Sequence, residues 1–386
     1  MKRHIQLVLI LFACSLPLSA QQPCVGFSVV VNTPEDTLML AVNGADTPQE
    51  QIAALDNFFQ EHADAKFIPC AHEYSAIAHM KLNEYDKAIE HGEKALVGDY
   101  RDVTLMMNLA KAYVASGKFS DVAFDTIMKA PEQIKIESTP GRPATVPEEE
   151  WAKTKQEAAE QGKEWRAYME YAFFQLLQRE ADLQKRVAWL DKFVEAYPDS
   201  PNAAQTNFNY FIAYKMANNA AKTAEFGEKA IASDPENVVT LNLVADDYAG
   251  RKSNLDKAEE YAKKAVALGP GIKKAEGMAD DQFKAYVDTQ MGLAHLTLGY
   301  VGFLRNEKTR KVAPAIAEFK AAADLLAANP ELQGKALYFL GSAYEFQYPP
   351  NHKLAIDALS RGASVQSGFR GASQDLLAKV KKAAGQ

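Results

Sequence analysis

The chain has little of what enzymes and metal proteins usually depend on. Its 386 residues include three cysteines and no Cys-x-x-Cys pair, which argues against the common structural zinc sites. It has neither a phosphate-cradling glycine loop nor a Gly-x-Ser-x-Gly turn, so the usual signatures of nucleotide binding and serine hydrolysis are missing. We therefore predict that the protein is not an enzyme and carries no cofactor.

Long apolar runs and excess positive charge are also missing. Beyond the first twenty residues no stretch has the ~20 apolar residues that a spanning helix needs, so we expect no transmembrane span in the mature chain. The 43 basic and 50 acidic residues give a net charge of −7. Because phosphate contacts require clustered Lys and Arg, this balance argues against nucleic acid as a partner.

Histidines supply the one pattern that is similar to a metal site. A zinc-protease helix carries His-Glu-x-x-His, whereas here His72-Glu73 is followed by His79, seven residues after the first histidine. That spacing puts the two rings about 10 Å apart along a helix, too far for one ion. We predict no metal site, with His79 packed as a core ring and His91 exposed.

The start of the chain has the layout of a secretory signal peptide. Lys2 and Arg3 precede the apolar run Ile5–Ala13, and Leu18-Ser19-Ala20 suits a cleavage site before Gln21. We predict a leader over residues 1–20 and export to the periplasm or the outer-membrane periphery. A lipoprotein acylated at Cys14 is the lesser alternative, because Phe12 is bulky for a lipobox.

Two cysteines, Cys24 and Cys70, remain after such a leader is removed. An exported chain resides where disulfides persist, so the two can form a bridge or stay as free thiols. A bridge would attach the strand-like stretch Val25–Val31 to the first helices.

An ungapped internal duplication is the strongest pattern in the sequence. Residues 55–96 and 190–231 align at an offset of 135, and thirteen of the 42 aligned residues are identical. The offset is one short of four 34-residue periods, and 34 is the period of a helix–turn–helix repeat.

Five segments in phase resemble the pattern Leu-Gly-x-x-Tyr, and each carries a ring at its last position. The segments are Ser75-Ala76-x-x-His79, Leu109-Ala110-x-x-Tyr113, Tyr210-Phe211-x-x-Tyr214, Val244-Ala245-x-x-Tyr248 and Leu340-Gly341-x-x-Tyr344. With these motifs the chain resembles the tetratricopeptide-repeat family over most of residues 48–370. The resemblance implies an all-α, right-handed solenoid of antiparallel helix pairs.

Prolines divide the predicted array. Pro140, Pro143 and Pro147 cannot all lie within a helix, so residues 137–147 are predicted to be a loop. The predicted organisation is an N-terminal extension at 21–47, a repeat lobe at 48–136, that loop, a second lobe at 148–370 and a capping helix at 371–386.

The resemblance also implies that the first helix of each repeat lines a concave groove. An amide can donate to and accept from a peptide backbone, so a row of asparagines beside aromatic rings suits an extended peptide or a helix. The predicted groove residues are Asn108, Lys111, Phe208, Asn209, Asn242, Asp246, Tyr338 and Phe339.

Three functions are compatible with this sequence. The first is a non-enzymatic exported scaffold that binds a protein or peptide partner. The alternative is a carrier for a small molecule or glycan that uses Trp151, Trp165 and Trp189 as a stacking platform. The third is an enzyme whose residues converge only in space.

Overall fold

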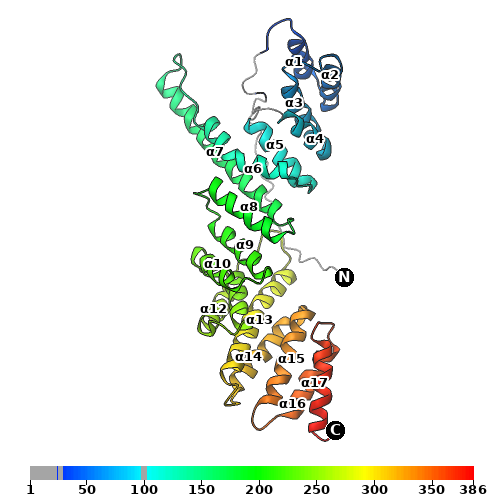
Figure 1. The fold of residues 1–386 in the computed structure, drawn as a ribbon, viewed down its shortest axis with the longest axis vertical. Coiled ribbons are helices and arrows are strands. Elements are labelled where there is room, and N and C mark those ends of the chain that lie inside the picture. The colour runs from blue at the N-terminus through cyan, green and yellow to red at the C-terminus, as the bar shows by residue number, and fades with distance from the viewer. Residues whose placement is uncertain (1–23, 25–28, 97–101) are drawn as a thin grey trace. The chain divides into compact units, whose positions relative to one another are not determined.

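The protein is built entirely from helices in the part of the chain that the structure describes. A computed structural model describes residues 24, 29–96 and 102–386, and these form seventeen α-helices, two short 3-10 helices and no strand (Figure 1). The predicted all-α class is confirmed. The residues also divide into two compact units, one ending at Ser200 and the other comprising Pro201–Gln386.

The first unit holds eight helices. In chain order they are α1 (Pro34–Gly44), α2 (Pro48–Glu61), α3 (Ile68–Lys81), α4 (Tyr85–Ala95), α5 (Val103–Ser116), α6 (Asp121–Ser138), α7 (Glu148–Leu177) and α8 (Leu183–Ala196).

The second unit holds nine α-helices and both 3-10 helices. In chain order they are α9 (Ala203–Met216), α10 (Ala220–Ser233), α11 (Val238–Gly250), α12 (Leu255–Leu268), η1 (Gly269–Gly271), α13 (Asp280–Arg305), α14 (Ala313–Leu325), η2 (Leu326–Ala328), α15 (Pro330–Phe346), α16 (His352–Ser364) and α17 (Arg370–Ala383).

Capping residues set where many of these helices begin. Before α2, the Thr47 hydroxyl accepts from the Glu50 backbone N–H while the Glu50 carboxylate accepts from the Thr47 N–H, a complete capping box. Asp102 caps α5 with a single bond, in which its carboxylate accepts from the Leu105 N–H at 2.6 Å. At the other end of α5, Gly117 adopts φ 70°, a left-handed stop that glycine tolerates without strain.

Neighbouring repeats approach each other closely at small residues. Gly92 of α4 faces Leu109 of α5 so closely that an added Cβ would lie 2.5 Å from Leu109 Cδ2. The residue 135 places later, Gly227 of α10, faces Val244 of α11 in the same way. The sequence duplication is therefore also a duplication of helix-packing contacts.

A hydrogen bond between neighbouring repeats is duplicated at the same offset. The Tyr113 hydroxyl of α5 donates to Glu93 Oε1 of α4 at 2.5 Å, and the Tyr248 hydroxyl of α11 donates to Glu228 Oε1 of α10 at 2.6 Å. Both tyrosine side chains are buried. The repeat tyrosines thus fill the core and also attach each repeat to the one before it.

The N-terminal extension contains more helix than the sequence suggested. Residues 34–44 form α1, whose Leu38 and Val42 are buried against α2 and α3. Of the strand-like stretch Val25–Val31, residues 25–28 lie outside the described residues, and Val29–Val31 form no strand. These three valines are exposed, so they do not form the buried face of a strand.

The proline-rich segment is a connection between two helices of the first unit. Helix α6 ends at Ser138 and α7 begins at Glu148, and the two helices pack against each other. In sequence the boundary between the two compact units falls at Ser200–Pro201 rather than at this loop. Farther on, α13 runs for 26 residues, so the segment after Leu298 continues as helix up to Arg305.

The last helix ends the second unit with a polar outer face. Helix α17 packs on α16 and α15 and buries only Ser373 and Val380. The helix begins at Arg370, so Ser373 lies within its first turn and packs against Gly362 in the core.

Two sequence predictions concern membranes. The predicted leader, including Cys14, lies outside the described residues. Among the helices that the structure describes, none combines the length and the apolarity that crossing a bilayer requires.

Candidate functional site

Charged side chains from three separate helices meet on one face of the second unit. The Asp246 carboxylate of α11 lies 3.8 Å from Lys215 Nζ of α9 and 3.4 Å from Lys335 Nζ of α15. All three side chains stay accessible, with exposed fractions of 43% for Asp246 and 30% for each lysine. We call Lys215, Asp246 and Lys335 the charged triad.

The ion pair between Asp247 and Arg251 holds one member of the triad, Lys215, in place. Asp247 is 7% exposed and accepts from Arg251 Nε at 2.9 Å, one turn along α11. Its other oxygen lies 3.6 Å from Lys215 Nζ. Lys215 is therefore held between two carboxylates. The buried Asp247 carboxylate needs positively charged partners, so the fold fixes the position of the Lys215 ammonium.

Apolar side chains continue this face along α9 and α11. Phe208, Ile212 and Leu243 are half-buried and pack against the core beneath α9, α11 and α13. On α15, Tyr338 lies one turn after Lys335, and its ring centroid is 5.6 Å from that of Phe369. Phe339 turns to the core, 5.7 Å from the Phe319 ring and nearly parallel to it. The face thus offers charge beside partly accessible apolar surface.

The predicted row of asparagines is only partly available for a partner. Asn108 and Asn209 are half-buried, and each donates its amide to its own helix, to the Thr104 carbonyl at 2.9 Å and the Gln205 carbonyl at 2.8 Å. These are local bonds that helical asparagines commonly make. A partner would therefore have to compete with them.

Asn242 does not lie on the open face. It is 3% exposed and donates to the Gln290 carbonyl at 2.9 Å and to Gln290 Oε1 at 3.1 Å. The long α13 covers this side of α11, which the sequence could not show. Asn242 is a contact between two helices, and we leave it out of the site.

Lys111 and Asn108 belong to the first unit, away from the triad in sequence. The Lys111 ammonium lies 5.9 Å from the centre of the Tyr168 ring. Burial lowers the pKa of Lys111 below its usual value. These two residues therefore form a separate surface on α5 and α7.

Lys215 and Lys335 were missed by the sequence reasoning. Both lie on first helices of their pairs, but 120 residues separate them in the sequence. Only the stacking of α9, α11 and α15 brings both to Asp246. A search for charged residues on the first helices would have found them only as part of a larger set.

Trp165 and Trp189 offer little of the stacking surface that the carrier hypothesis needs. One face of Trp189 is stacked on Phe124, with centroids 4.8 Å apart, and the Lys185 ammonium lies 4.6 Å from the ring centre. Trp165 is 9% exposed. A cavity of about 400 Å³ at the end of α7 reaches Trp189, Phe119 and Arg179.

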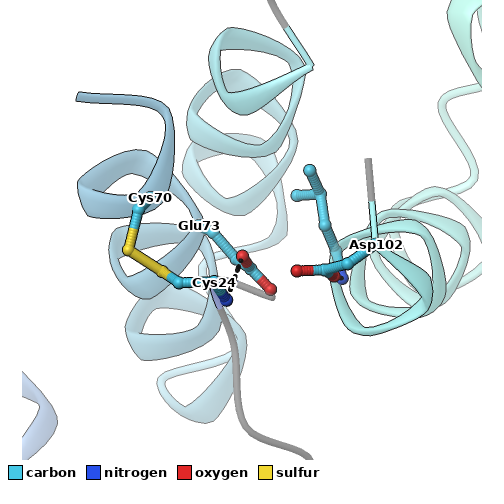
Figure 2. Close-up of a disulfide and its surroundings, with 5 residues drawn as sticks. Cys24, Cys70, Glu73 and Asp102 are labelled. Carbon is cyan, nitrogen blue, oxygen red and sulfur yellow. Dashed lines mark hydrogen bonds between the residues drawn. A yellow bond between two sulfur atoms is a disulfide. The ribbon is translucent and has the colours of Figure 1, made fainter. Parts of the chain in front are cut away.

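A disulfide and a buried carboxylate lie together near the N-terminus of the first unit. Cys24 and Cys70 are bonded, with Cα atoms 5.2 Å apart. The Cys24 backbone N–H donates to Glu73 Oε2 at 3.0 Å, and Glu73 is fully buried. Figure 2 shows the Glu73 carboxylate between Cys24 and Asp102, the residue that caps α5. The arrangement joins the segment before α1 to α3.

Metal-binding geometry is not found in the described ranges. Within residues 24, 29–96 and 102–386, no group of three or more His, Cys, Asp or Glu side chains is placed to hold an ion.

Comparison with known proteins gives structural likeness only. No family model matches the sequence, and no curated protein matches it. Among solved structures, the C-terminal part of a TPR repeat-containing protein from Cytophaga hutchinsonii has a TM-score of 0.43 and 14% identity, covering 79% of this chain and 98% of that one.

Two further solved structures have lower scores. A tetratricopeptide repeat protein from Parabacteroides merdae has a TM-score of 0.29 and 14% identity, covering 79% of this chain and 97% of that one. The TPR2AB domain of yeast Sti1 in complex with an Hsp90 peptide has a TM-score of 0.26 and 17% identity, covering 70% and 99%. The chain's own helix pairs, packed through small residues, are those of a tetratricopeptide-like array.

Proposed function

We propose that this protein is a non-enzymatic scaffold that binds a peptide or a helix of another protein on the second unit. The observation that carries the proposal is the charged triad, where α9, α11 and α15 deliver Lys215, Asp246 and Lys335 to one accessible place. A helix array offers such a surface because each first helix contributes a few side chains to a continuous face.

The chemistry of the face suits a mixed polar and apolar segment. Phe208, Ile212 and Leu243 supply half-buried apolar surface, which would give most of the binding free energy. The triad would set register and orientation, since charged contacts at accessible positions contribute specificity more than affinity. Its two lysines flank a single accessible carboxylate, so a partner with an acidic residue beside apolar ones fits best.

Export is part of this proposal. The basic, apolar and small-residue order of residues 1–20 supports transport to the periplasm or the outer-membrane periphery, and the Cys24–Cys70 disulfide fits an oxidising compartment. Labelling intact and permeabilised cells with a membrane-impermeant reagent would test the location. Protein found only in the cytosolic fraction would contradict it.

The binding face is tested by photo-crosslinking in the native cells. A crosslinking amino acid at Leu243 should capture a defined partner, and the charge reversal Lys335→Glu in the same chain, which would repel the partner's acidic residue, should abolish that capture. The matched control places the crosslinker at Lys320, an exposed residue on the second helix α14. Equal capture from both positions, or capture that survives the charge reversal, would overturn the assignment of this face.

A further inference from the structure

Four rings from three consecutive helices form a cluster in the first unit. The His72 ring of α3 is stacked on Phe59 of α2, with centroids 4.3 Å apart and planes inclined by 26°. The His91 ring of α4 lies 5.1 Å from His72 and 5.3 Å from His79. The Nδ1 atoms of His72 and His91 are 3.0 Å apart, which is hydrogen-bond distance. His91 is half-buried, so its predicted exposure is wrong.

The second copy of the duplication shows what packing alone requires at these positions. The residues 135 places after His72, His79 and His91 are Asn207, Tyr214 and Phe226. Tyr214 and Phe226 stack with centroids 5.5 Å apart and planes inclined by 23°. The same helix–helix contact is therefore made in one copy by rings that stay neutral and in the other by imidazoles.

The surroundings of the imidazoles oppose a positive charge more than they favour one. Burial lowers the pKa of His72 to about 4, and His91 and the Lys94 ammonium add to this effect. Burial also lowers the pKa of His91, with further contributions from His79 and Lys94. Glu90 of α4 acts in the opposite direction on both rings, and Asp56 of α2 does so on His91.

Neighbouring groups complete this environment. Glu84, at the start of α4, lies 2.7 Å from His79 Nδ1 and also binds Lys87. Glu93, on the other side of α4, accepts from Tyr113 of α5. These two carboxylates are already engaged, so they are poorly placed to neutralise a charge on His72 or His91.

The protonation state of the two imidazoles decides whether the hydrogen bond between their Nδ1 atoms can form. A bond between two Nδ1 atoms needs one N–H and one lone pair, so the two neutral rings share a single Nδ1 proton. Adding one proton at a free Nε2 keeps that bond but puts a charge in a partly buried site. Adding a second proton removes the lone pair, breaks the bond and puts two like charges side by side.

We propose that His72 and His91 form a proton-sensitive contact that holds α3 against α4 at neutral pH and releases it in acid. A histidine whose pKa is lowered by folding stabilises the fold in its neutral form. Its contribution is therefore present above the ordinary value of 6.5 and is lost as the pH falls from 6.5 towards 4. The device is local, because each repeat contacts mainly its neighbours.

Hydrogen exchange on the full chain tests this proposal with an internal reference. Exchange rates of α3 and α4 amides, corrected for the intrinsic effect of pH, should rise at pH 5 relative to pH 7. The expected rise is up to about tenfold per pH unit for each histidine below 6.5. Helices α9 and α10, the second copy, should show no comparable rise. An equal change in both copies would overturn the proposal.

Variants copied from the second repeat provide the matched control. His72→Asn combined with His91→Phe installs the residues found 135 places later and should remove the acid sensitivity of α3 and α4. His352→Gln, a change in the second unit, should leave it intact. Acid sensitivity that persists in the double variant would contradict the proposal.

An NMR titration of the wild-type imidazoles gives a second test if the double variant does not fold. His72 should show no protonation above about pH 5. A His72 midpoint near 6.5 would also overturn the proposal.

Discussion

At the scale of single residues, two tyrosines of the repeats each have two structural roles. Tyr113 and Tyr248 fill the core and donate to Glu93 and Glu228 of the preceding repeat. The carboxylate accepts from a buried hydroxyl in each case, and for both tyrosines burial and the neighbouring carboxylate raise the pKa well above its usual range. The hydroxyls therefore remain protonated donors at neutral pH.

Removing one hydroxyl tests the contribution of this bond. Tyr113→Phe should lower the free energy of unfolding by about 1.5–3 kcal/mol, the range for a hydrogen bond to a charged group. Tyr248→Phe should cost less, because Glu228 also accepts from Tyr261 at 2.8 Å and from Lys257 at 2.9 Å. Urea unfolding measures both, with Tyr286→Phe, a 39% exposed ring, as the control. Equal losses in all three variants would contradict the explanation.

At the scale of helices, the repeat depends on how closely two of them approach. The absence of a Cβ at Gly92 lets α4 approach α5, and the alternative of a longer side chain would meet the buried Leu109. A helical glycine otherwise costs about 1 kcal/mol relative to alanine. A glycine within a helix therefore needs a packing reason, which at Gly92 is the close contact with Leu109.

Two glycine replacements separate propensity from packing. Gly371→Ala in α17 has open space around the new methyl group and should stabilise the protein by about 0.5–1 kcal/mol. Gly92→Ala gains the same propensity but overpacks Leu109, which typically costs 1–3 kcal/mol, so we expect net destabilisation by about 1 kcal/mol. Thermal unfolding of both variants gives the sign. A stabilised Gly92→Ala variant would show that α4 and α5 can separate freely.

At the scale of the whole molecule, stability should be local. An array of helix pairs makes its contacts between neighbours, so a change at one end is felt mainly there. The Cys24–Cys70 disulfide closes a 46-residue span in the first unit only. Each of the two compact units has its own core, so a change of pH or denaturant can destabilise one unit more than the other.

Loss of the disulfide should therefore weaken one end of the chain. The double replacement Cys24→Ala with Cys70→Ala should reduce the stability of α1–α3 by about 4 kcal/mol on the chain-entropy account. Hydrogen exchange should be faster in α1–α3 and unchanged in α14–α17, which serve as the reference within the molecule. Uniformly faster exchange along both units would contradict local stability.

The sequence by itself determined the class of fold and the phase of the repeats. Ring residues such as Tyr113, and glycines such as Gly92, recur at a helical-pair period because close packing admits few substitutes at those places. The tertiary structure decided which side chains face outward and which meet across the array. Asn242 is covered by α13, Lys215 and Lys335 converge on Asp246, and His72 meets His91. These contacts depend on the stacking of separate helices, whose relative placement is not encoded in any local pattern.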